Sequence, residues 1–265
     1  MNVFKREMRA NRKALIIWSI GVILMIASSM GKYAGLSASG QSINDLLAEM
    51  PQSLKAVMGM GTFDLTMAIG YFGVLFIYLA MMATIHSAML GANIISKEER
   101  DKTAEFLFSK PISRNRIISS KLLASFVNIL ILNLVTFVSS ILMVQKYSKG
   151  EAVLGDITRL ILGMFILQLI FLFIGTVIAA VCKHPKTAPT LAAGILLITF
   201  MLSIGIDLNN RLEKLKYLTP FKYFDAKNLI SSQGFEPVYM ILSVLLIAVL
   251  LSATYVFYKH RDLNV

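Results

Sequence analysis

The densest group of chemically active side chains lies between Ser96 and Lys121, in the string SKEERDKTAEFLFSKPISRNRIISSK. Its carboxylates alternate with lysine and arginine at helical spacing, which favours i,i+4 ion pairs along a helix. Pro111 ends that helix and Ser113 can cap the next one. The acidic side chains and the apolar edge of the first helix are Glu98, Glu99, Asp101, Glu105, Ala104, Leu107 and Phe108.

Enzyme chemistry is not favoured by these groups. The pair Glu98 and Glu99 is similar to the E-E-x-x-x-R motif of membrane-embedded proteases, but position 103 is threonine and His86 has no partner at helical spacing on another span. No G-x-x-x-x-G-K-[ST] loop that could hold nucleotide phosphates occurs, and the three histidines lie in different segments. We therefore predict no catalytic residue, no cofactor-binding residue and no metal ligand in this chain.

The elements that position this segment must be membrane helices. With 56% hydrophobic and 15% charged residues, the chain is too apolar to form a soluble globule. A helix needs about 20 mostly apolar residues to cross a bilayer. We expect an all-α polytopic membrane protein in one transmembrane domain, residues 1–265, with spans at about 14–30, 69–95, 117–144, 160–182, 187–206 and 238–258.

The distribution of basic residues predicts the orientation of these spans. The two ends of the chain and the segments between spans two and three and between spans four and five hold 16 Lys or Arg against 6 acidic residues; the other three loops hold 10 against 9. Because lysine and arginine accumulate on the cytoplasmic side, both termini are expected in the cytoplasm, and we expect a multi-pass protein of the cell membrane, in a bacterial plasma membrane. The net charge of +11 is thereby explained without a nucleic-acid partner.

Two segments outside the spans have sequences that suit the membrane interface. Residues 1–13 place Phe4 and Met8 on one face and basic residues on the rest, which predicts an amphipathic interfacial helix that contacts membrane lipid. A plain basic flank of the first span is the alternative. Residues 207–237 contain YLTPFKYFDAKNL, whose aromatic residues suit the membrane interface.

Polar residues within the spans are few and neutral. They commonly form hydrogen bonds between helices, which we favour over a role in transport. No acidic residue lies in mid-span, which argues against an ion-coupled carrier. These candidate intramembrane contacts are His86, Asn93, Asn128, Asn133 and Gln168.

The string E-E-R-x-x-x-T-x-E-x-L-x-x-x-P-I-S-R, followed by Lys121, resembles the permeases of type-2 ATP-binding-cassette (ABC) exporters, as do six spans and the basic amphipathic start. The resemblance covers the whole chain and implies that residues 96–116 are a cytoplasmic coupling segment that docks on a separate ATPase. Phe106, Phe108 and Lys110 depart from the family's pattern. The implied ATPase-coupling residues are Glu98, Glu99, Arg100, Thr103, Glu105, Leu107 and Phe108. Residues 207–237 would form the family's external re-entrant segment.

The resemblance implies a membrane-spanning permease subunit that pairs with a second permease, as a homodimer or heterodimer, and with ATPase subunits that carry ATP and Mg²⁺. The substrate expected is an amphipathic peptide or a lipophilic antibiotic-like compound. Two alternatives from other classes remain at this point, namely a non-transport membrane scaffold or self-protection protein, and a secondary transporter.

Overall fold

The computed structural model describes residues 3–38, 50–51, 54–55, 58–60, 63–103, 112–148, 150–182, 184–230 and 234–260, and within these ranges the regular structure is helical. Among these residues, six long helices are apolar enough to cross a membrane, which confirms the predicted all-α architecture with six spans. They are α1 (Val3–Ala38), α4 (Ala68–Arg100), α6 (Arg114–Tyr147), α7 (Leu154–Val181), α8 (Ala188–Leu208) and α10 (Pro237–His260).

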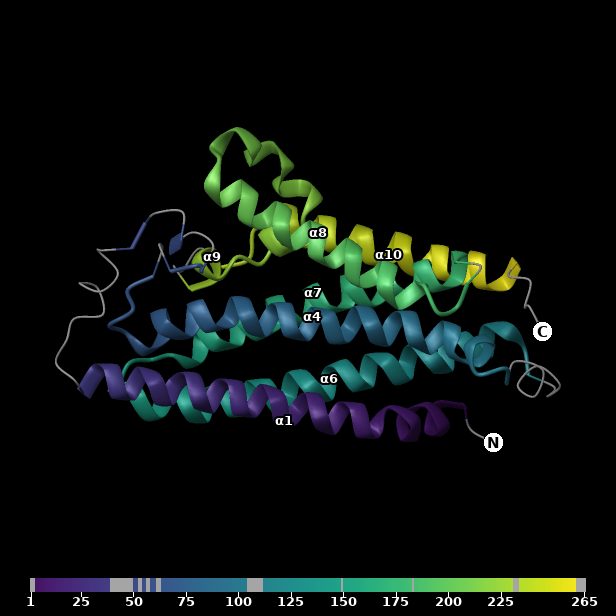
Figure 1. Ribbon diagram of the computed structural model, residues 1–265, viewed down its shortest axis with the longest axis horizontal. Helices are drawn as coiled ribbons and strands as arrows, with labels where there is room; N and C mark the ends of the chain where they lie inside the picture. The colour runs from purple at the N-terminus through teal and green to yellow at the C-terminus, as the bar shows by residue number, and fades with distance from the viewer. Residues whose placement is uncertain are drawn as a thin grey trace.

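The six helices run lengthwise beside one another, and the described ends of the chain, Val3 and His260, lie at the same end of the bundle (Figure 1). We call this the terminal end. The junction of α4 and α6 lies there too. The other end carries three short elements between α8 and α10, namely η1 (Asn210–Leu218), η2 (Pro220–Lys222) and α9 (Ala226–Ile230). They fall within the predicted segment 207–237.

The N-terminal region differs from the prediction. Instead of an interfacial helix over residues 1–13 followed by a separate span, α1 is one uninterrupted helix of 36 residues. No glycine or proline lies between Val3 and Trp18, so nothing in that stretch breaks the helix once it is nucleated. At a rise of about 1.5 Å per residue the helix is roughly 54 Å long, which exceeds the hydrocarbon thickness of about 30 Å and leaves its basic first turns beyond the apolar layer.

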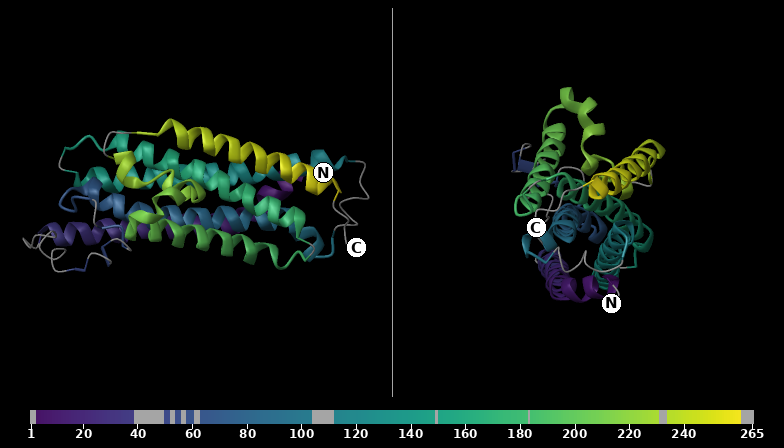
Figure 2. Two further views of the ribbon diagram at one scale, coloured as in Figure 1. Left: turned by 90° about the horizontal axis from the view of Figure 1, so that it is seen from above. Right: turned by 90° about the vertical axis from the view of Figure 1, so that its right-hand side faces the viewer.

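The centre of the bundle is α4, which packs against α7, α8, α6 and α1 and lies inside the other helices when the bundle is viewed end-on (Figure 2). Two glycines permit its close contact with α7. A Cβ atom on Gly175 would overlap the carbonyl oxygen of Ala88 and lie 2.9 Å from the Ala92 nitrogen, and one on Gly91 would lie 3.1 Å from the Leu172 carbonyl carbon. The α4–α7 pair is therefore a contact between backbones, which small residues allow in membranes.

The outer helices expose apolar side chains. In α10, Ile241 and Val249 are 61% and 63% exposed, and Ile198 in α8 is 69% exposed. A lipid or protein surface must cover these faces, since a soluble protein rarely exposes such continuous apolar area.

Candidate functional site

Five charged side chains from three helices form one network at the terminal end, which we call the ionic cluster: Arg6 and Glu7 of α1, Lys97 and Glu98 of α4, and Lys121 of α6. The Arg6 guanidinium donates to Glu7 Oε1 at 2.9 Å and to Glu98 Oε1 at 2.7 Å. The amine of Lys97 pairs with Glu7 Oε2, and that of Lys121 pairs with Glu98 Oε2. The five groups thus form a continuous chain from Lys97 through Glu7, Arg6 and Glu98 to Lys121.

Much of this cluster is removed from solvent. Lys121 and Glu7 are fully buried and Glu98 is 5% exposed. The Lys121 amine also donates to the Ile94 carbonyl oxygen. A buried charge is tolerated only when partners satisfy it, so each carboxylate here needs its cations in place. The cluster therefore ties the last turns of α4 to α1 and α6.

The C-terminus of α4 is closed by a defined turn directly after the ionic cluster. The Thr103 amide donates to the Glu98 carbonyl at 2.8 Å and the Lys102 amide donates to the Glu99 carbonyl at 3.3 Å. Lys102 has φ 55°, so the helix ends in a Schellman motif with lysine at the left-handed position that usually holds glycine. Arg100, which donates to Asn93 Oδ1 at 2.8 Å and to Asp101 Oδ1 at 3.0 Å, also lies here.

The start of α6 follows the sequence prediction. The Ser113 hydroxyl accepts a hydrogen bond from the Arg116 amide at 3.4 Å, so Ser113 is the N-cap. Arg114 donates to the carbonyl oxygen of Lys259 at 3.0 Å, a contact between the beginning of α6 and the end of α10. A cavity of about 410 Å³ lies between α1 and the end of α4, and its lining includes Arg6, Asn93, Lys97, Glu98, Arg100, Asp101 and Thr103.

The predicted coupling residues thus fall into three groups. Glu98 faces inward and is part of the ionic cluster, whereas Arg100 and Thr103 are exposed and Glu99 is half-buried. Glu105, Leu107 and Phe108 lie outside the described residues. Docking of this segment on an ATPase stays a prediction.

Sequence reasoning missed Arg6, Glu7 and Lys97 as site residues, and for Lys121 it left a lipid contact and a protein contact equally open. The signal was present in the sequence. Glu7 is the only acidic residue among the first 40, and Lys121 follows two serines and precedes a long apolar run. A lone charge of this kind needs a partner of opposite sign, which the sequence by itself does not locate.

Four of the five predicted polar residues inside the spans lie at contacts between helices, whereas Asn93 accepts from Arg100 of its own helix. Asn133 of α6 donates to Gln168 Oε1 of α7, and Gln168 Nε2 donates to the Ala83 carbonyl of α4 at 3.2 Å. Asn128 donates to the Ala124 carbonyl at 2.7 Å and to Met8 Sδ at 3.2 Å. His86 meets Trp18 edge to face, with ring centroids 5.4 Å apart. Within the described residues, no group of three or more His, Cys, Asp and Glu side chains is arranged to bind a metal ion.

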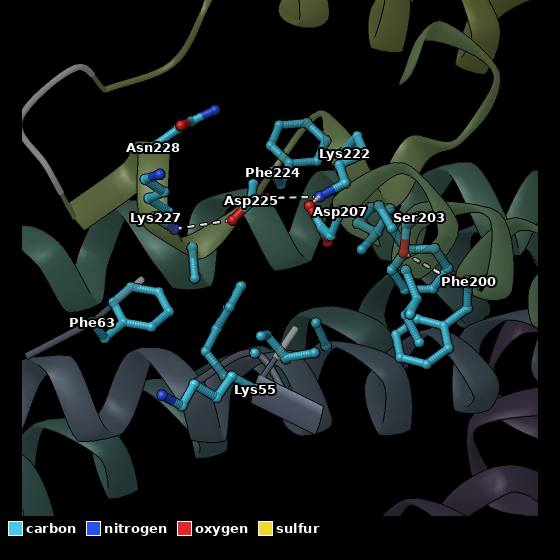
Figure 3. A pocket seen from close by; sticks show the side chains of 18 of the residues that line it. Lys55, Phe63, Phe200, Ser203, Asp207, Lys222, Phe224, Asp225, Lys227 and Asn228 are labelled. Atoms are coloured by element: carbon cyan, nitrogen blue, oxygen red, sulfur yellow. Dashed lines mark hydrogen bonds and ion pairs between the residues drawn. The ribbon is translucent and has the colours of Figure 1, made fainter. Parts of the chain in front are cut away.

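A second and larger cavity, of about 790 Å³, lies away from the ionic cluster, toward the end opposite the terminal end. It is enclosed by α4, α8, η2, α9 and described residues between 50 and 63, and Figure 3 shows its lining. Lys222 lies at its wall, where its amine pairs with Asp207 and, at 3.1 Å, with Asp225 Oδ2. Burial would lower the pKa of Lys222, but the carboxylates of Asp225 and Asp207 outweigh burial and raise that pKa above its usual value.

The sequence model of one protein family, described as "ABC-2 family transporter protein", matches residues 1–263. No curated protein matches the chain.

Proposed function

Since this chain belongs to the ABC-2 transporter family, whose proteins are multi-pass permease components that act with an ABC ATPase, we propose that it forms the translocation path of an exporter. Its cargo is an amphipathic peptide or a lipophilic antibiotic-like compound. The ATPase is a separate component, and it is there that ATP and Mg²⁺ bind. A second permease copy, identical or similar, completes the path, and the exposed apolar faces of α8 and α10 offer surface for that copy and for lipid.

The ionic cluster is the observation that carries the mechanism. Residues 96–116 form the coupling segment, and the cluster fixes the helix that leads into it to α1 and α6. When ATP binding closes the ATPase dimer, the segment moves and the three helices move with it. Bending α4 alone would separate the buried carboxylate of Glu98 from Arg6 and Lys121, and that of Glu7 from Lys97. Coupling requires only that the ATPase contacts the segment differently in its two states.

Both termini and residues 96–116 are cytoplasmic in this proposal, as the distribution of basic residues suggests. Lys214 lies in η1, at the opposite end from the thiol of Cys182. In intact cells, a Lys214→Cys chain that also carries Cys182→Ser should react with a membrane-impermeant maleimide. Cys182 of the unaltered chain should react only after permeabilisation. The reverse pattern would invert the topology and remove the ATPase from the coupling segment.

Co-purification with the ATPase tests the coupling role. Charge reversal at Glu99 and Glu105 should lower the amount of ATPase recovered with the tagged permease and abolish cargo-stimulated ATP hydrolysis. Glu213→Lys is the matched control, since Glu213 is an exposed acidic residue of η1 at the other end of the bundle. Unchanged recovery and turnover in the Glu99 and Glu105 variants would refute the coupling role. Transport that continues without ATP and follows an ion gradient would identify a secondary transporter instead.

A further inference from the structure

The larger cavity has the size and lining of a ligand site. Its volume of about 790 Å³ falls within the range of about 300–1,000 Å³ that small-molecule sites occupy. Aromatic rings form much of its wall, and Phe200 and Phe221 pack edge to face with centroids 5.2 Å apart. The phenylalanines that line it are Phe63, Phe76, Phe200, Phe221 and Phe224. Such a wall fits an extended apolar chain.

The carboxylates of the cavity already have donors. Asp207 and Asp225 share the amine of Lys222, and Asp225 Oδ1 also accepts from the Lys227 backbone amide at 3.1 Å. This bonding holds the turn from η2 into α9 against the end of α8. Both aspartates are therefore already paired within the protein, and a cationic ligand would have to displace Lys222 from both of them.

The two other charged groups in the described part of the lining are cations. Among the described residues, neither the Lys55 amine nor the Lys227 amine has an ion-pair partner. Figure 3 shows Lys227 and Phe63 at one end of the cavity and Phe200 and Ser203 at the other, with the Lys55 side chain directed toward the end that holds Phe63. Charge and apolar surface thus both line one cavity, with the unpaired cations toward one end.

We propose that this cavity binds an anionic amphiphile, whose carboxylate or phosphate head is held by the amines of Lys55 and Lys227 and whose apolar chain lies along the phenylalanines. A lysine amine holds either head group as a point charge with rotatable donors. The identification of this ligand as the cargo of the exporter rests on the proposed function. Binding itself requires only the permease chain.

Fluorescence of cis-parinaric acid, titrated onto the purified full-length chain in neutral detergent, tests the charge recognition. Lys55→Gln/Lys227→Gln should raise the Kd for the acid by roughly tenfold or more, the loss expected for charge-assisted hydrogen bonds, while the Kd for its neutral methyl ester stays unchanged. Lys214→Gln is the matched control, because Lys214 is an exposed lysine of the neighbouring η1 outside the cavity. Equal Kd values for acid and ester, or no change in the double variant, would overturn the proposal.

Filling the cavity tests the location. Ala80→Phe adds a ring to the wall without altering a charge and should abolish binding of both probes; retained binding places the ligand elsewhere and overturns the proposal. Oleate and lysophosphatidate as competitors distinguish a carboxylate head from a phosphate head. Unfolding curves of each variant verify the fold, and the single lysine variants repeat the test if the double variant unfolds. A wild-type chain that binds neither probe but still co-purifies with the ATPase would remove this inference and leave the proposed function. A wild-type chain that binds the probe but recovers no ATPase would remove the proposed function alone.

Discussion

Replacing Glu98 by glutamine removes the carboxylate that Arg6 and Lys121 share while keeping the shape of the side chain. In the wild-type chain this carboxylate is 5% exposed, and Lys121, its partner through Oε2, is fully buried. The variant leaves three cations, Arg6, Lys97 and Lys121, around the single carboxylate of Glu7. Breaking a buried pair by removing one partner costs about 3–5 kcal/mol, because the remaining charge is buried without compensation.

Thermal unfolding of the purified chain in detergent measures this cost. For a chain of this length each kcal/mol lowers the unfolding temperature by roughly 2–4 °C, so Glu98→Gln should unfold about 6–20 °C below the wild type. Glu98→Gln/Lys121→Met removes both partners and should recover more than half of that loss, since no lysine then remains buried beside an uncharged amide.

Asp101→Asn is the control. Asp101 pairs with Arg100 at 3.0 Å, but their side chains are 55% and 38% exposed, so the loss should stay below about 1 kcal/mol. Equal unfolding temperatures for wild type and Glu98→Gln, or a double variant no more stable than Glu98→Gln, would refute the reasoning that Glu98 and Lys121 form a buried charged pair.

Three further predictions concern backbone contacts and charge. Gly175→Ala should cost about 1–3 kcal/mol in thermal unfolding because its methyl group would overlap the Ala88 carbonyl, whereas Gly155→Ala, with no atom within 4 Å, should change stability by less than about 1 kcal/mol; equal effects would contradict the close α4–α7 contact. Lys102→Gly should raise stability by roughly 1 kcal/mol in the same assay, since glycine adopts a φ of 55° without strain; a loss would exclude the left-handed turn. Lys222→Gln should be less stable than the wild type at neutral pH. Because the raised pKa of Lys222 gives stability that is lost as pH rises through it, the difference in stability between the two chains should shrink above about pH 10.4. A difference in stability that stays constant to about pH 11.5 would contradict the pairing of Lys222 with Asp207 and Asp225.

The spans could be predicted from the sequence because lipid imposes length and apolar composition on any crossing helix. Each predicted span overlaps one long helix. Two predicted end residues, Cys182 and Thr187, lie one residue outside α7 and α8. The full lengths could not be predicted in the same way. Hydropathy detects only the part of α1 within the apolar layer, whereas backbone hydrogen bonding continues the helix through the basic residues before it.

The site was predicted in part. Ser113 identified the start of α6. The predicted helix from Glu98 to Phe108, ending at Pro111, was wrong about the end of α4, because α4 ends at Arg100 and the turn at Lys102 closes its last carbonyls. The inward direction of Glu98 could not be predicted, because it depends on where α1 and α6 pack, and the partners Arg6 and Lys121 are 92 and 23 residues away in the chain. Helical spacing predicts which residues share one face of a helix. When opposite faces both carry charged residues, it does not predict which face is buried.

The ionic cluster also restricts the order in which the chain can be assembled during synthesis. Its members leave the ribosome in the order Arg6 and Glu7, then Lys97 and Glu98, then Lys121. The first four can pair as soon as the second span has been inserted, with two charges of each sign. The third span must keep its lysine at the aqueous surface until that pair of helices presents Glu98, because an unpaired cation in the bilayer costs several kcal/mol. Closure of the network therefore coincides with completion of the first three-helix unit, and a nascent chain whose second span fails to insert leaves its third span with a lysine at the water boundary.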